Sequence, residues 1–143
     1  LGAPAMMSLR ALPLMVIPFI VYNLIAATFS GDVAVVFNEH LFSLPLGGGR
    51  KLFLSKGDIV ILLTMVCLFF ELIKSTWTGS ASLIDHGLSM LVFIACLIEF
   101  ILVPRAATSP FFFIMIAALI DVIAGYTIGI RTARRDLSIG GDA

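Results

Sequence analysis

Four long apolar segments, separated by short polar stretches, dominate the pattern of this 143-residue chain. They occupy residues 11–30, 58–75, 83–103 and 110–130. Each is close to the ~20 residues that a helix needs to cross a ~30 Å hydrocarbon layer. The apolar runs are continuous rather than alternating, which is typical of helices and not of barrel strands. The pattern predicts one transmembrane domain over residues 1–143, an all-α membrane protein with a four-transmembrane-helix antiparallel bundle.

Composition agrees with a membrane environment. Apolar residues make up 60% of the chain and charged residues 13%, and the mean hydropathy is +1.13. A soluble domain is typically about half apolar and a quarter charged. Since a soluble fold of this length could not bury so much apolar surface, we expect the lipid bilayer to be a partner of the chain. The first apolar segment is long for a signal peptide, so we interpret it as a retained helix.

The longest connection, residues 31–57, is predicted to have structure of its own. Two short apolar-rich runs, Phe42–Leu46 and Lys51–Leu54, flank the turn Gly47–Arg50. Apolar runs on both sides of a glycine turn are typical of a β-hairpin. Val33–Leu41 would form a short interfacial helix before the hairpin. We expect this outer loop to lie on the outer surface of the membrane.

Helix starts carry their own markers in the sequence. Asp58 can cap the second helix. Ser82 and Asp85 have the spacing of a capping box at the start of the third. Ser109 followed by Pro110 is typical of an N-cap and a first helical position, which places the start of the fourth helix there.

Basic residues give the orientation of the bundle. With both termini in the cytoplasm, five basic residues would lie inside and four outside. The inside set is Arg10, Lys74, Arg131, Arg134 and Arg135, and the outside set is Arg50, Lys51, Lys56 and Arg105. Because short cytoplasmic segments carry an excess of Lys and Arg, the compact group after the fourth helix favours cytoplasmic termini.

Polar side chains within the apolar segments are candidate functional residues, since each is costly in hydrocarbon unless it has a partner or a purpose. The candidates are Asp121, Glu99, Glu71, Asn23 and His86. Asp121 is predicted near mid-membrane, and Glu99 in the outer half, where Asn23 could meet it. Glu71 is expected to pair with Lys74 one helical turn later. His86 opens the third helix, where an interfacial hydrogen-bonding role is expected.

These polar residues recur at helical spacing. Thr64, Cys67, Glu71 and Lys74 form one stripe on the second helix, and Asp85, Ser89, Cys96 and Glu99 form one on the third. On the fourth helix the small residues Ala117, Gly125 and Gly129 share a ridge with Asp121, one residue every four. Such a ridge, with its GxxxG spacing, lets another helix approach closely, so we expect it to be a helix-packing surface.

Several kinds of chemistry are not supported by the sequence. Net charge is zero, which gives no electrostatic footprint for nucleic acid. Cys67 and Cys96 lie inside apolar segments and are interpreted as packing residues rather than as a disulfide or metal ligands. His40 and His86 should lie on opposite membrane faces, so one chain cannot hold haem between them. We therefore expect no metal, no cofactor and no enzymatic activity.

Two functions remain open. The first is a non-enzymatic accessory or assembly subunit, in which other membrane-protein subunits, or further copies of this chain, complete the pairing of deep carboxylates. The alternative is a small homo-oligomeric transporter or proton pathway that uses Glu71, Asp121 and Glu99. A transporter should contain a polar cavity that is reached from one face, whereas a subunit should bury Asp121 or Glu99 against another helix.

One resemblance bears on location. The stretch from the hairpin through Gly57-Asp58, the run LSMLVFIACLIEFILVPRAATSPFFF and the ending DVIAGYTIGIRTARRD together resemble small uncharacterised four-helix inner-membrane proteins of Gram-negative bacteria. The likeness is one of general pattern. It implies a bacterial inner-membrane location, and it implies no activity and no site residues.

Overall fold

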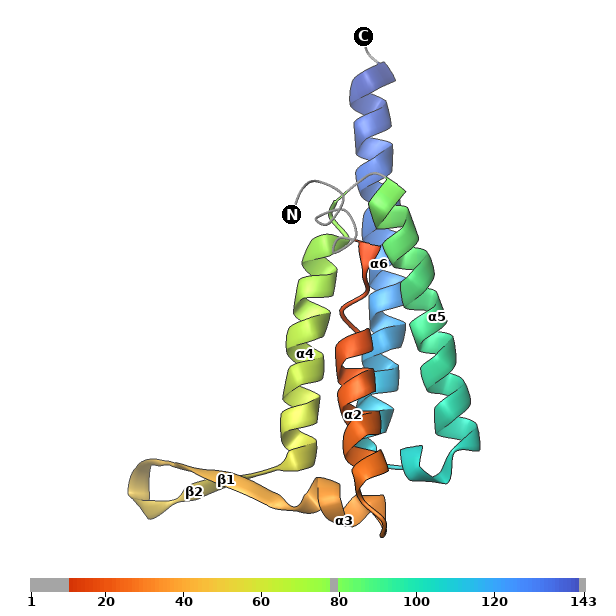
Figure 1. Cartoon of the computed structure of the whole chain (residues 1–143). Helices are drawn as coiled ribbons and strands as arrows, with labels where there is room; N and C mark the ends of the chain where they lie inside the picture. The colour runs from red at the N-terminus through yellow and green to blue at the C-terminus, as the bar shows by residue number, and fades with distance from the viewer. Residues whose placement is uncertain (1–10, 78–79, 142–143) are drawn as a thin grey trace, which may run out of the picture.

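The computed structural model describes residues 11–77 and 80–141, which form five α-helices and a two-stranded hairpin. In chain order they are α2 (Val16–Thr28), α3 (Val33–Asn38), β1 (His40–Pro45), β2 (Lys51–Ser55), α4 (Lys56–Lys74), α5 (Ser80–Leu102) and α6 (Ser109–Gly141). The helices α2, α4, α5 and α6 lie side by side (Figure 1) and are called the bundle here. The hairpin and α3 lie at one end of the bundle, and the last turns of α6 extend beyond the other end.

The prediction of four transmembrane helices is wrong. Among the described residues, only two helices are long and apolar enough to cross a membrane, over Ser82–Leu102 of α5 and Ser109–Arg131 of α6. The helix α2 has 13 residues, which at 1.5 Å per residue span only about 20 Å. The helix α4 has 19 residues but carries charged side chains at both ends. The two apolar spans associate the chain with a membrane by length and composition.

The reason for the shorter first helix lies in the chain before it. Residues Leu14 and Met15 form a turn after Pro13, in which the N–H groups of Val16 and Ile17 donate to the Pro13 and Leu14 carbonyls at 3.3 and 3.0 Å. Regular helix therefore begins only at Val16. Apolar composition alone could not reveal this turn, because a proline does not always end a helix: Pro18 is accepted within the first turn of α2.

Helix starts agree with the sequence markers only in part. A capping box opens α4: Asp58 N–H donates to Ser55 Oγ at 3.1 Å, and Ser55 N–H donates to Asp58 Oδ2 at 2.9 Å. The predicted capping box of Ser82 and Asp85 is wrong, because α5 already begins at Ser80 and Asp85 is bonded elsewhere. The helix α6 begins at Ser109, one residue before the predicted first position Pro110, and the Thr108 hydroxyl rather than that of Ser109 accepts from the Phe111 N–H at 3.4 Å. The helix continues past residue 130 to Gly141.

An aromatic cluster holds the hairpin end of the bundle together. The ring of Tyr22 from α2 stacks on Phe37 from α3 with centroids 4.5 Å apart, and meets Phe111 from α6 edge-on at 4.9 Å. The Tyr22 hydroxyl donates to the Arg105 carbonyl at 2.7 Å. The Arg105 guanidinium in turn donates to the Ala26 and Phe29 carbonyls, which end α2 without intrahelical partners. Three helices are therefore fixed to one another at this end.

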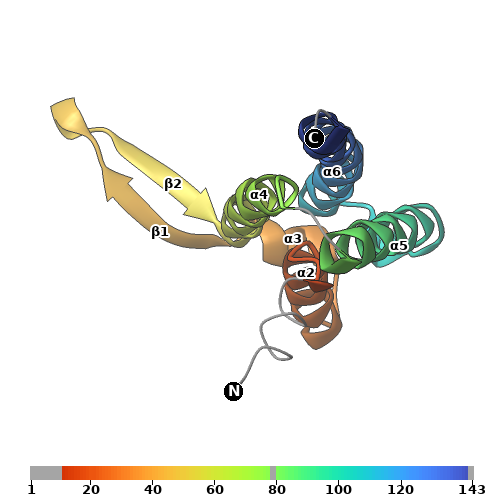
Figure 2. The ribbon, with the colours of Figure 1, turned by 90° about the horizontal axis from the view of Figure 1, so that it is seen from above.

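The predicted β-hairpin is present. Strands β1 and β2 pair antiparallel in the register Phe42↔Leu54, Ser43↔Phe53 and Leu44↔Leu52. The turn uses Gly48 and Gly49 at φ 74° and 76°, a conformation that side chains rarely adopt, which explains the glycines there. Seen along the bundle axis, the hairpin projects sideways from the start of α4 (Figure 2).

Candidate functional site: a buried polar centre

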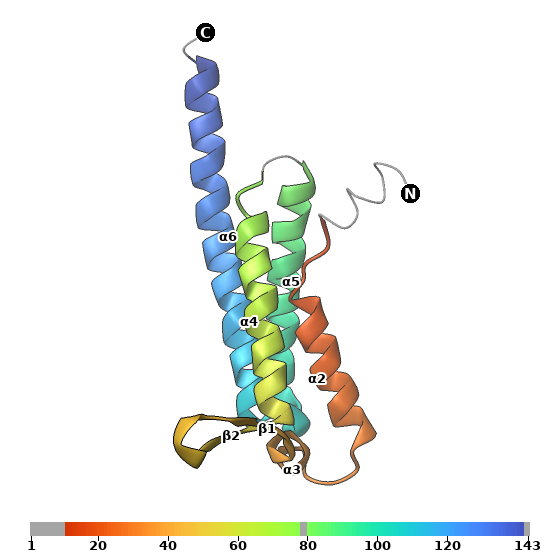
Figure 3. The ribbon, with the colours of Figure 1, turned by 90° about the vertical axis from the view of Figure 1, so that its left-hand side faces the viewer.

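Six polar side chains from three helices gather in the half of the bundle away from the hairpin. They are Glu71 and Lys74 of α4, Asp85, His86 and Ser89 of α5, and Asp121 of α6, and are called the polar centre here. Each keeps 9% or less of its surface exposed. In this region α4 and α5 both pack against α6 (Figure 3). The stripe residues Thr64, Cys67 and Cys96 are buried as well.

Lys74 is the hub of the polar centre. Its Nζ donates to Glu71 Oε1 at 3.0 Å, to Asp85 Oδ1 at 3.0 Å and to the Leu12 carbonyl at 2.6 Å. An ammonium group has three N–H donors, so its capacity is used in full. Glu71 Oε1 also accepts from the Leu14 N–H at 2.6 Å. The predicted ion pair of Glu71 with Lys74 is confirmed, and it extends to α5 and to the segment that precedes α2.

The electrostatic balance of the centre is uneven, since three carboxyl groups share one cation. Glu71 lies on α4, outside the two membrane-spanning segments, and burial raises the pKa of its carboxyl above the ordinary value. The neighbouring Asp85 carboxylate acts on that pKa in the same direction, whereas the Leu14 N–H and Lys74 oppose it. Asp121 is within electrostatic reach of Glu71, Asp85 and Lys74.

Three buried polar atoms of the centre lack a hydrogen-bond partner among the described residues: His86 Nε2, Ser89 Oγ and Asp121 Oδ2. Ser89 and Asp121 lie close to each other across the contact of α5 with α6. No hydrogen bond of normal geometry satisfies either atom. Buried polar groups are usually paired. A water molecule or a proton bound at these three atoms would supply the hydrogen bonds that they lack.

His86 occupies the ridge of small residues on α6. A Cβ atom at Gly125 would lie 3.1 Å from His86 Nδ1, and one at Gly129 would lie 3.2 Å from His86 Nε2. The ring of Tyr126 completes the pocket, with its centroid 5.5 Å from that of the imidazole. The ridge is therefore a packing surface, and at its two glycines it receives a histidine ring of α5 rather than another helix backbone. Ala117, further along the ridge, packs in the apolar cluster with Met15 and Cys67.

Asn23 and Glu99 do not belong to the polar centre. The Asn23 amide donates to Glu99 Oε2 at 3.3 Å and to the Phe19 carbonyl at 2.9 Å, so the two side chains meet as the sequence indicated. They lie toward the hairpin end, and buried apolar residues including Cys96 and Ile114 occupy the core between them and Asp121. The structure thus places Glu71 within electrostatic reach of Asp121, sets His86 against Gly125 one helical turn after Asp121, and leaves Asn23 and Glu99 as a separate pair.

Lys74, Asp85 and Ser89 complete the centre and were not among the candidate site residues. The signal for them was present in the inward stripes on the second and third apolar segments. Asp85 was assigned to a helix cap, because its spacing from Ser82 matches a capping box and the true start of α5 could not be seen.

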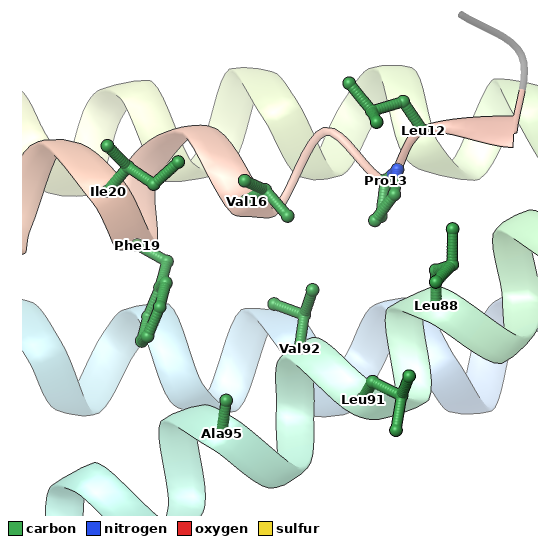
Figure 4. Close-up of a pocket in the computed structure, with 9 residues that line it drawn as sticks. All are labelled: Leu12, Pro13, Val16, Phe19, Ile20, Leu88, Leu91, Val92 and Ala95. Carbon is green, nitrogen blue, oxygen red and sulfur yellow. The ribbon is translucent and has the colours of Figure 1, made fainter. Parts of the chain in front are cut away.

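An apolar groove of about 390 Å³ lies between α2 and α5 (Figure 4). Its walls are Leu12, Pro13, Val16, Phe19 and Ile20 on one side and Leu88, Leu91, Val92 and Ala95 on the other. A smaller hollow of about 200 Å³ lies at the hairpin end beside Asp32, Arg105 and Thr108. Neither hollow is lined by a residue of the polar centre.

No protein-family model, curated protein or solved structure matches this chain. The class is defined by the fold and the site: a small helical protein with two candidate membrane-spanning helices and an internal ion-pair network. Within residues 11–77 and 80–141, no three His, Cys, Asp or Glu side chains are grouped so as to hold a metal ion.

Proposed function

We propose that the protein is a non-enzymatic, multi-pass subunit of a bacterial inner-membrane assembly, formed with other membrane proteins or with further copies of itself. One observation carries the proposal: Lys74 and the groups that it binds pair with one another inside the chain, whereas large apolar side chains face outward. Lys74 and its partners hold α4, α5 and the start of α2 together. Large apolar side chains on the outward faces, such as Met65 and Phe69 of α4 and Leu91 of α5, are 60–61% exposed.

Glu99 supports a role in assembly. It lies in a candidate membrane-spanning segment, is half-buried, and has the neutral amide of Asn23 as its hydrogen-bond donor. A carboxyl group in such a position is stabilised when a neighbouring chain supplies a further donor.

Native mass spectrometry of the protein released from membranes in mild detergent should give a defined complex heavier than the 15.4 kDa chain. Glu99→Ala should weaken that complex, and a monomer throughout would contradict the proposal.

A proton pathway is the second candidate, because Asp121 Oδ2, Ser89 Oγ and His86 Nε2 are buried and have no hydrogen-bond partner within residues 11–77 and 80–141. One observation weighs against it: buried apolar residues, among them Cys96 and Ile114, lie between these atoms and the pair of Asn23 and Glu99. A pathway needs polar groups or water in sequence across the bilayer.

Asp121→Asn separates the two candidates. Asparagine keeps the size and most of the polarity of aspartate but cannot exchange a proton. We expect wild type and Asp121→Asn, each reconstituted in liposomes under an imposed pH gradient, to show the same low proton flux as empty liposomes. Circular dichroism should confirm that both are folded. Flux in the wild type that Asp121→Asn abolishes would establish the pathway instead.

Orientation is tested by labelling. The end of α6 and the hairpin lie at opposite ends of the bundle, so cysteines at Ser138 and Gly47 should react from opposite sides. The buried native cysteines, Cys67 and Cys96, are replaced by alanine in both probes. With the arginines that follow the last span in the cytoplasm, an impermeant maleimide added to intact spheroplasts should label Gly47→Cys and not Ser138→Cys. The reverse pattern would overturn the orientation.

A further inference from the structure

The two faces of the hairpin differ in chemistry. Residues directly opposite each other in an antiparallel pair share a face, and neighbours along a strand alternate. One face therefore carries Phe42 with Leu54 and Leu44 with Leu52, all four apolar. Phe42, Leu44 and Leu52 remain 40–45% exposed. A two-stranded hairpin with this much open apolar surface is marginal in water and needs a surface to cover it.

The other face is mixed, because it holds Phe53, which is 66% exposed, and Pro45 opposite Lys51 as well as polar side chains. It carries Ser43 opposite Phe53, and His40 joins it because an irregular register between His40 and Phe42 shifts the alternation. The His40 imidazole bonds Ser43 Oγ at 2.8 Å, and its ring lies 5.5 Å from that of Phe53. The tip adds Arg50 and Lys51, both exposed. The hairpin thus combines one apolar face, one mixed face and a cationic tip.

The root of the hairpin is fixed relative to the bundle. The Lys56 N–H donates to the Glu39 carbonyl at 3.0 Å, and their side chains form an ion pair at 2.5 Å. A Cβ at Gly57 would lie 2.9 Å from the Phe37 carbonyl oxygen, so the start of α4 is pressed against α3. From this root the hairpin extends across the helix axes, at the end where Pro104–Ala106 joins α5 to α6 (Figures 1 and 2).

We propose that the hairpin lies flat on the surface of anionic lipid beside the bundle. If α5 and α6 cross the bilayer, the turn that joins them lies at the headgroup layer, and the hairpin extends at that level. The face of Phe42, Leu44, Leu52 and Leu54 contacts the acyl boundary, as the apolar face of an interfacial element does. Arg50 contacts lipid phosphate groups at the tip, and Lys51, whose side chain leaves from the other face, reaches them with its long flexible stem. The charge of the tip favours lipid over a second copy, whose hairpin would present the same two cations.

The test compares tryptophan probes on the two faces in the full chain. Trp77, the single tryptophan, is replaced by phenylalanine, and Leu44→Trp or Ser43→Trp is introduced at neighbouring positions of β1. The protein is reconstituted in vesicles of phosphatidylcholine with phosphatidylglycerol that carry a shallow nitroxide lipid. The nitroxide should quench Leu44→Trp severalfold more than Ser43→Trp, whereas aqueous acrylamide should quench them in the opposite order. Equal quenching of both positions by acrylamide would overturn the proposal.

Two further arms identify the occupant. The double change Arg50→Gln and Lys51→Gln should lower nitroxide quenching of Leu44→Trp in anionic vesicles. The affinity of the hairpin for the lipid surface should fall about fivefold for each positive charge removed. The same pair of changes should have no effect in pure phosphatidylcholine, and an equal effect in both lipids would contradict the role of the cationic tip. Protection of Leu44→Trp from acrylamide should persist when the protein is diluted with excess lipid. Loss of protection on dilution would assign the apolar face to a second copy and refute the lipid contact. Neither result bears on the native mass of the complex, which tests the subunit function separately.

Discussion

Lys74→Met should destabilise the protein by about 3–5 kcal/mol, because removal of one partner from a buried ion pair leaves uncompensated charge behind. Glu71 and Asp85 would remain 1% and 3% exposed without the ammonium group that now bonds both. The Leu12 carbonyl would lose its donor as well. The free energy of unfolding, measured by SDS titration in mixed micelles with circular dichroism, should fall by that amount.

A neutral version of the same cluster provides the control. Lys74→Met combined with Glu71→Gln and Asp85→Asn removes all three charges and keeps similar side-chain volumes. Since a buried ion pair and its uncharged replacement are often close in energy, the triple variant should recover most of the lost stability. Lys51→Met, on the exposed hairpin, should leave stability within about 0.5 kcal/mol of wild type. If Lys74→Met alone were as stable as wild type, water would have to reach the cluster.

The polar centre could be predicted from the sequence in outline. Polar residues at helical spacing on the second and third apolar segments identified the inward faces, and the structure buries Thr64, Glu71, Lys74 and Ser89 on them. Spacing within one helix does not state which faces of two helices meet. The contact of Lys74 with Asp85 joins residues 11 positions apart across a helix–helix corner, and it depends on where α5 begins.

The number of membrane-spanning helices could not be read from apolar segment length. The first segment contains 20 mainly apolar residues, yet the turn at Pro13 leaves a helix of 13 residues. The second segment covers residues 58–75, but its helix has 19 residues from Lys56 to Lys74, so charges lie within the helix itself. The hairpin could be predicted from the sequence, because a glycine turn and the apolar runs on both sides of it are local signals.

His86 shows the same limit of sequence reasoning at a single residue. An interfacial role was expected from its position near a helix start, whereas the structure buries it to 9% exposure against Gly125 and Gly129. A GxxxG spacing indicates that something approaches the helix closely, but not whether a backbone or a side chain does so. The nearest non-hydrogen atoms decide between these, and here they belong to the imidazole ring.

Gly125→Leu should therefore destabilise the protein through a collision with one identifiable side chain. The first added carbon would lie 3.1 and 3.2 Å from His86 Nδ1 and Cε1, closer than ordinary van der Waals contact. Overpacking of a tight site usually costs about 1–3 kcal/mol. Gly87→Leu is the matched control, because Gly87 lies on the exposed side of α5 with nothing within 4 Å of its Cβ position. That variant should be neutral or slightly stabilising, since leucine favours helix over glycine.

A double-mutant cycle then identifies the contact. His86→Ala removes the imidazole and leaves a space that the leucine side chain of Gly125→Leu can fill. Unfolding free energies of the two single variants and the combined variant should show a favourable coupling of about 0.5–3 kcal/mol, the range found for residues in direct contact. Additive losses would mean that residue 125 meets some group other than His86. A coupling of this size would establish that the glycine ridge of α6 is shaped for a histidine ring of α5, which closes the polar centre on the side of Asp121.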